Sequence, residues 1–231
     1  GYNTSSPTTP GRGAIIAGDF QLEQNQTLQL LVGQSPIDNS DDAAGGGGTY
    51  VVHINDPLII AGGGGGTDND SSDLCHANAT IDANPGQEYG AGSDGEGGYS
   101  DGSSGGGAGW NSNGEGCSIS AKRFFEGGFG GISPSGADYN GGFGGGGCSD
   151  GGKAGGGGGF TGGGSGNEWA GGAGSLNNGV NQSNIGGLEN PNTGHGSLHI
   201  ELIYNNTANE LIIFSDSISF ANTNVNNYNT A

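Results

Sequence analysis

Short apolar runs rich in β-branched residues, each bounded by Gly, Asn or Pro, lie near both ends of the chain and predict β-strands. Leu198, Ile200 and Leu202 alternate with polar residues, which places one face of that strand in a core and the other in water. No segment has the period of a helix, so we predict an all-β fold. The six predicted strands are GAIIAGDF (13–20), TLQLLVG (27–33), TYVVHIN (49–55), PLIIA (57–61), SLHIELIY (197–204) and ELIIFSDSISF (210–220).

The segment between the fourth and fifth predicted strands, residues 62–196, has a different composition. It holds 48 of the 57 glycines in 135 residues, whereas the remaining 96 residues hold 9. Glycine buries no side chain and loses the most backbone entropy on ordering, so main-chain hydrogen bonds are the large favourable interaction that remains. Because the flanking strands must pair, the insertion has to be compact enough to bring its ends together.

One extended conformation suits such a segment. A left-handed helix of the polyproline II type has three residues per turn, no internal hydrogen bonds and outward-facing polar groups. Glycine helices of this kind can bond to one another, because no side chains hold them apart. Collagen requires glycine at every third residue, and runs such as Gly62–Gly66 break that rule. We therefore predict polyglycine II helices.

The predicted organisation is one domain with two textures. An N-terminal arm (1–12) is followed by the strands of a β-sandwich (13–61 and 197–220), interrupted by the glycine-rich insertion (62–196), and a C-terminal tail (221–231) ends the chain. All-β units of this length are common.

The charge excludes one class of partner. The chain has 4 Lys and Arg against 23 Asp and Glu, a net charge of −19, and phosphate backbones are bound by the opposite sign. We expect no nucleic acid partner and a solvated acidic surface. No apolar run approaches the ~20 residues of a transmembrane helix, so we also expect no membrane span.

Sequons and cysteines favour a secreted, extracellular protein. Three cysteines are too few and too scattered for a zinc site, and a disulfide is the expected use in a secreted chain. Cys117 and Cys148 are the favoured pair, because both lie in the glycine-rich body. Cys75 is then a free thiol or a crosslink to a second chain. Six asparagines head glycosylation triplets: Asn3, Asn25, Asn69, Asn78, Asn181 and Asn205.

Catalytic and metal motifs are imperfect. Gly147 to Lys153 matches a phosphate-binding loop, but Ala154 replaces the Mg²⁺-binding hydroxyl and no helix follows. GYSDG (98–102) matches a hydrolase nucleophile elbow without its strand-to-helix turn. We therefore expect no enzyme and no cofactor. A calcium loop remains a minor alternative at TDNDSSD (67–73), which lacks the usual glycine and glutamate and would use Asp68, Asp70 and Asp73.

Six segments, taken in order, resemble the extracellular glycine-rich module best known from the anaplastic lymphoma kinase and leukocyte tyrosine kinase receptors. The likeness covers roughly residues 13–204. It implies a jelly-roll sandwich, similar to tumour necrosis factor, with a polyglycine II bundle emerging between its strands. The segments are QLLVGQ (29–34), GGGGTYVV (45–52), PLIIAGGGGG (57–66), GGFGGGGCSDGGKAGGGGGFTGGG (141–164), GGAGSLNNGVNQSN (171–184) and TGHGSLHIELI (193–203).

The chain departs from that family at both ends. Family members usually begin with further strands, whereas this chain ends with an additional strand-like run, residues 210–220. A sandwich that lacks strands has an open edge, and open edges recruit strands. The extra run or the N-terminal arm would fill that edge in a neighbouring copy or within its own subunit.

These features favour a non-enzymatic function. The leading hypothesis is a secreted structural subunit of an extracellular filament or coat, assembled into a homo-oligomer or polymer by strand complementation between copies. The alternative is an adhesin or receptor-type binding module that recognises a glycan or an extracellular protein.

Overall fold

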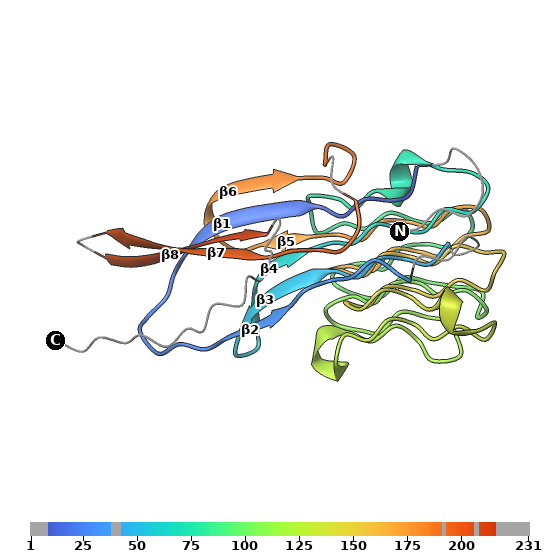
Figure 1. Ribbon diagram of the computed structural model, residues 1–231, viewed down its shortest axis with the longest axis horizontal. Coiled ribbons are helices and arrows are strands. Elements are labelled where there is room, and N and C mark those ends of the chain that lie inside the picture. Colours follow the sequence, from blue (N-terminus) through green and yellow to red (C-terminus); the bar gives the residue numbers. More distant parts are fainter. Residues whose placement is uncertain (1–8, 38–42, 191–192, 206–207, 216–231) are drawn as a thin grey trace.

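Two four-stranded sheets form one end of the molecule, and the glycine-rich segments extend from them to form the other end (Figure 1). The computed structural model describes residues 9–37, 43–190, 193–205 and 208–215. All strand pairs are antiparallel, in the orders β6-β1-β8-β7 and β2-β3-β4-β5. The strands are β1 (Ile15–Gln21), β2 (Leu28–Leu31), β3 (Thr49–His53), β4 (Asp56–Ala61), β5 (Leu176–Asn177), β6 (Val180–Ile185), β7 (His199–Asn205) and β8 (Ala208–Ser215).

The all-β class is confirmed. Each of the six predicted runs overlaps one strand, and the helical structure of the described residues is limited to three single 3₁₀ turns: η1 (Asp73–Cys75), η2 (Phe124–Glu126) and η3 (Ala137–Tyr139). β8 ends at Ser215, and the rest of its predicted run, residues 216–220, lies outside the described residues, as do the C-terminal tail and residues 1–8 of the N-terminal arm.

Two strands were not predicted, and both lie within the range assigned to the glycine-rich insertion. β6 pairs with β1 as an edge strand, and every one of its residues is exposed. Its sequence, VNQSNI, therefore has no buried face to produce an apolar alternation. β5 has only two residues, too few for any periodicity.

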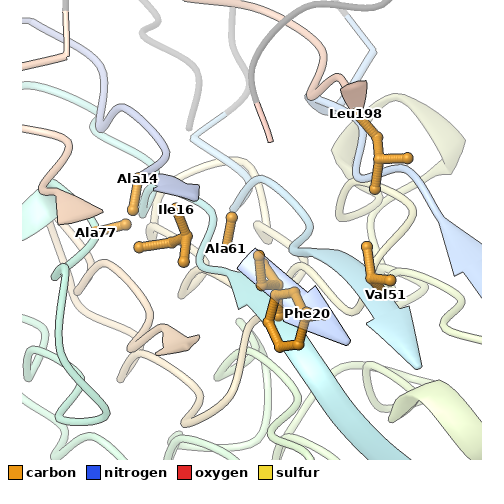
Figure 2. Close-up of a cluster of buried hydrophobic side chains, with 8 residues drawn as sticks. Ala14, Ile16, Phe20, Val51, Ala61, Ala77 and Leu198 are labelled. Atoms are coloured by element: carbon orange, nitrogen blue, oxygen red, sulfur yellow. The ribbon is translucent and has the colours of Figure 1, made fainter. Parts of the chain in front are cut away.

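The main core lies between the two sheets (Figure 2). Ile16 and Phe20 of β1 point into it from one sheet, and Val51 and Ile59 meet them from the other. Fully burying an aliphatic or aromatic side chain of this size stabilises a fold by about 1.5–3 kcal/mol. The core therefore fixes the strand register of both sheets.

The second sheet is covered on its other face by the glycine-rich part of the chain. Tyr50 and Val52 are buried on that face, where Trp110, Phe124 and Phe160 pack against their cluster. The rings of Tyr50 and Phe124 lie 5.5 Å apart, centre to centre. Because both faces of β3 are covered, its residues Thr49 to Val52 are all buried.

The additional C-terminal strand lies inside its own sheet. β8 pairs with β1, from Ile16 opposite Ser215 to Gln21 opposite Glu210, and with β7 on its other side. It thus occupies a central position between two strands of the same chain, which is the arrangement expected if the extra run fills the gap within its own subunit.

Candidate functional site

The glycine-rich body, here residues 43–48 and 62–174, is joined by main-chain hydrogen bonds that recur at every third residue. The amides of Gly63 and Gly66 both donate to carbonyls of segment 155–158, at 2.9 Å each. The carbonyls of the same two glycines both accept from amides of segment 170–173, at 3.0 Å each. One side of this segment therefore faces the same neighbour once every three residues.

The same interval occurs elsewhere in the body. Gly45 and Gly48 both donate to segment 144–147, and Gly105 and Ala108 both donate to segment 145–148. The donor-to-acceptor distances in these four bonds lie between 2.8 and 2.9 Å. A β-strand, by contrast, alternates its bonds with a period of two residues.

Each segment also has neighbours in more directions than a sheet allows. A strand in a sheet has at most one partner on each side, in one plane. Segment 62–66 bonds to segments 155–158 and 170–173, receives the amide of Gly46, and donates from Gly65 to the carbonyl of Cys75. The body is therefore a three-dimensional bundle of extended segments.

Close approach of the segments explains the composition. A methyl group built on Gly107 would overlap the carbonyl oxygen of Gly157, and one on Gly45 would overlap that of Gly156. These neighbours are backbone atoms, which cannot rotate away as a flexible side chain can. Where the interior holds a residue larger than glycine, that residue is often alanine: Ala108, Ala154, Ala170 and Ala173 are fully buried.

A disulfide joins Cys117 to Cys148, which are 31 residues apart in the sequence. The bond links the start of segment 117–133 to segment 144–148. Cys75 is a free and fully buried thiol. Because it is buried, its sulfur is inaccessible. Burial also raises the pKa of Cys75 from 9.0 to about 11, so the thiol is almost entirely protonated at neutral pH.

The three aspartates considered for calcium are not gathered into one cluster. In the part of the chain that the structure describes, no three His, Cys, Asp or Glu side chains lie close enough to hold a metal ion. Asp70 accepts a hydrogen bond from the amide of Ser71, and Asp68 accepts one from the side chain of Asn69. Asp73 begins η1. The loop therefore directs the carboxylates of Asp68 and Asp70 to local donors.

The asparagines of the glycosylation triplets differ in how their side-chain nitrogens are engaged. Asn25 is exposed in a turn with a φ of 72°. The Nδ2 atom of Asn78 donates both to the carbonyl of Asp82 and to Asn84, at 2.9 Å each, and that of Asn181 donates to Asp19 at 2.7 Å. Asn69 is exposed, Asn205 ends β7, and Asn3 lies outside the described residues.

Three of the four cations are paired with carboxylates. Lys122 and Arg123 both contact Glu126. Lys153, the lysine of the phosphate-loop-like stretch, pairs with Asp101. Burial raises the pKa of Asp101, but hydrogen bonds from Lys153 and Ser103 outweigh it and lower the net value below the ordinary 3.8. This lysine is therefore engaged by a carboxylate.

Arg12 joins the N-terminal segment to the body. Its amide donates to Nδ1 of His76 at 3.1 Å, and its guanidinium donates to the carbonyl of Leu188 at 2.8 Å. Burial, and then the charge of Arg12, lower the pKa of His76 below its ordinary 6.5. The imidazole is therefore neutral at physiological pH and serves as an acceptor.

A polar cavity of about 90 Å³ lies beside Arg12, between the entry to β1 and the loop 193–197. Glycine backbone forms much of its wall, with His195 and Ser35 at one side; the amide of Ser35 donates to Nδ1 of His195 at 3.2 Å. Pockets for drug-sized ligands are about 300–1,000 Å³, so this cavity is too small for one.

Exposed apolar side chains gather on segment 119–132, a feature that composition alone did not reveal. Phe129 is 62% exposed, and Phe125, Ile119 and Ile132 are also exposed. Ile119 and Ile132 face each other through paired main-chain hydrogen bonds of 3.3 and 2.8 Å. Phe129 also lies against Phe143, with ring centres 6.2 Å apart.

Comparison of the chain with family models, with curated proteins and with solved structures gives no match. No helix among the described residues is both long and apolar enough to cross a membrane.

Proposed function

We propose that this protein is a secreted structural subunit of an extracellular filament or coat, built from a jelly-roll sandwich and a bundle of polyglycine II helices. The observation that carries the proposal is the three-residue interval of the bonds made by Gly63 and Gly66. Polyproline II geometry repeats every three residues and directs its polar groups outward, so it accounts for that interval.

Such a bundle suits a mechanical and protective role. Its amides are bonded to several neighbouring segments, so a protease must break many hydrogen bonds before it can extend one segment. Buried positions hold glycine, alanine or small polar residues such as Ser104, Thr161 and Ser165, which leaves few large side chains to repack under load. The result is a stiff block formed mainly by backbone.

Secretion is supported by chemistry and by resemblance. The bond between Cys117 and Cys148 requires an oxidising compartment to persist. The ordered likeness to the glycine-rich module of the two receptor kinases, over residues 13–204, implies an extracellular jelly roll. The receptor role itself does not transfer, because the likeness extends to the module alone.

Strand complementation between copies is the proposed means of assembly. β8 is central in its sheet, yet it is the last strand of the described chain, so exchange of β8 between two copies would preserve every pairing with β1 and β7. Exchange would then link subunits without a new interface.

Electron microscopy of the purified protein tests this function. We expect regular fibres from the full chain and none after deletion of residues 209–231. Because that deletion removes β8, a peptide of residues 208–220 is added as a control, and it should restore the fold without restoring fibres. A full chain that stays monomeric at all concentrations, or fibres that persist in the truncated protein, would contradict the proposal.

A binding module is the second candidate, and the exposed apolar side chains on segment 119–132 favour it. An aromatic residue such as Phe129, 62% exposed, is typical of surfaces that recognise glycans or proteins. Glycan-array and extracellular-protein binding of the monomer test this candidate. Phe129→Ala should then weaken binding at least tenfold, whereas Ile54→Ala, at another exposed apolar position, should leave it unchanged.

A further inference from the structure

An apolar row crosses three strands of the first sheet and ends at the exposed Leu202 of the edge strand β7. Leu202 lies opposite Leu211, which lies opposite Phe20 of β1. Residues in one such row share a face of the sheet, so the side chains of Leu202 and Phe20 are on the same side. Phe20 is 7% exposed in the core, whereas Leu202 is 66% exposed. Figure 1 shows the β7–β8 hairpin extending past the ends of the other strands.

The two edges of this sheet differ in how well they are protected. The pairing of β6 with β1 is irregular between Ala17 and Asp19, and Asn181 has a φ of 49°. Bulges and polar residues are devices that keep edge strands from pairing with other chains. The register of β7 with β8 is continuous over its seven residues, and β7 contains neither proline nor lysine.

We propose that the outer edge of β7 pairs with β7 of a second copy of this chain, in antiparallel, two-fold symmetric register about Leu202. This would join two four-stranded sheets into one of eight strands and bury both copies of Leu202 against each other. The contact deepens the proposed function by naming a place where copies meet. It is separate from the exchange of β8.

Charge and composition favour a second copy as the occupant. Each copy carries a net charge of −19, so copies associate best where charge is low, and Glu201 is the one carboxylate of β7. A register centred on Leu202 sets Glu201 opposite Ile203 of the second copy, which keeps the two carboxylates apart. Residues 216–231 include five asparagines, a poor match for an apolar row.

The test compares two lysine substitutions in the full chain by sedimentation velocity over a range of concentrations. Leu202→Lys and Val180→Lys change equally exposed residues, 66% each, on the two opposite edge strands of the same sheet. We expect the native chain to dimerise reversibly, Leu202→Lys to raise the dimer Kd at least tenfold, and Val180→Lys to leave it unchanged. Far-UV circular dichroism verifies that both variants fold.

Disulfide trapping provides an independent readout. Mild oxidation should convert Leu202→Cys into a covalent dimer that reductant reverses, and Val180→Cys should stay monomeric; buried Cys75 is common to both. Equal effects of the two lysine substitutions overturn the proposal. A full chain that stays monomeric also overturns it. So does a chain that dimerises only after residues 216–231 are removed, because those residues would then cover β7. Equal effects of the two lysine substitutions in a chain that still forms fibres overturn the pairing but leave the proposed function standing. A Leu202-dependent dimer that never forms fibres supports the pairing and counts against the filament.

Discussion

Individual glycines in the body are required because neighbouring segments lie too close together to leave room for a side chain. A Gly107→Ala substitution places a methyl group against the carbonyl oxygen of Gly157. Two hydrogen-bonded segments must move apart to remove this overlap. We expect the free energy of unfolding to fall by about 1–3 kcal/mol, the usual cost of overpacking. Urea denaturation measures the change.

Gly152 is the matched control for that prediction. A methyl group there would meet nothing closer than the side chain of Asp150, at 3.9 Å. Gly152→Ala should therefore leave stability unchanged or raise it by up to about 1 kcal/mol, because alanine restricts the unfolded chain. Equal losses from the two substitutions would show that glycine is needed for some reason other than close packing.

One histidine, His76, contributes to the dependence of stability on pH. Burial and the charge of Arg12 lower the folded-state pKa of His76 below 6.5, so the unfolded chain binds the proton more readily. The contribution of His76 is complete above pH 6.5 and decreases as the pH falls below that value.

The expected result is a free energy of unfolding that decreases between pH 7 and pH 5. His76→Asn keeps an acceptor for the amide of Arg12, 3.1 Å from Nδ1 in the native protein, but removes the titrating group. In denaturation experiments, the free energy of unfolding of this variant should decrease less steeply with falling pH over the same range. An identical slope in the variant would assign the pH dependence to the carboxylates.

At the scale of elements, side-chain pattern determined what was predictable. β1 to β4, β7 and β8 were predicted because each lies in an alternating or buried apolar run, and the predicted runs contain β-branched residues. β6 was missed because its four central residues are polar and all six of its residues are exposed. The partners of the glycine segments were equally out of reach: the bond from Gly63 to Gly158 depends on geometry, and glycine has no side chain from which a pairing can be inferred.

The disulfide ties two of these segments together, and its loss should cost stability. The loop closed between Cys117 and Cys148 has a sequence separation of 31. Closing a loop of that size restricts the unfolded chain by about 3–4 kcal/mol in the loop-entropy model. The double substitution Cys117→Ser and Cys148→Ser should lower the free energy of unfolding by about that amount in urea denaturation.

The double variant has a natural internal control. Cys75→Ser changes the buried free thiol but closes no loop, so its effect reports burial alone. If the double variant loses no more stability than Cys75→Ser, segments 117–133 and 144–148 are held in the unfolded chain by something other than the disulfide.

At the scale of the molecule, the sandwich and the glycine-rich body share a core. Trp110, Phe124 and Phe160 extend from the body to cover the sheet that contains β3. The hydroxyl of Tyr50 donates into the body, 3.2 Å from the carbonyl oxygen of Gly159, and burial raises the pKa of Tyr50 far above its ordinary value. The two parts should therefore unfold together and not as independent domains.

Native-state hydrogen exchange tests that unity. The amides of Gly63 and Gly66 donate to segment 155–158, and the amide of Gly107 donates to Gly163, so these segments cannot detach without breaking bonds to their neighbours. We expect these amides to exchange as slowly as those of Val51 in β3, and the exposed turn at residues 23–26 to exchange rapidly. Fast exchange throughout the body beside a protected sheet would mean that backbone hydrogen bonds alone do not hold the body rigid. The proposed structural role would then lose its physical basis.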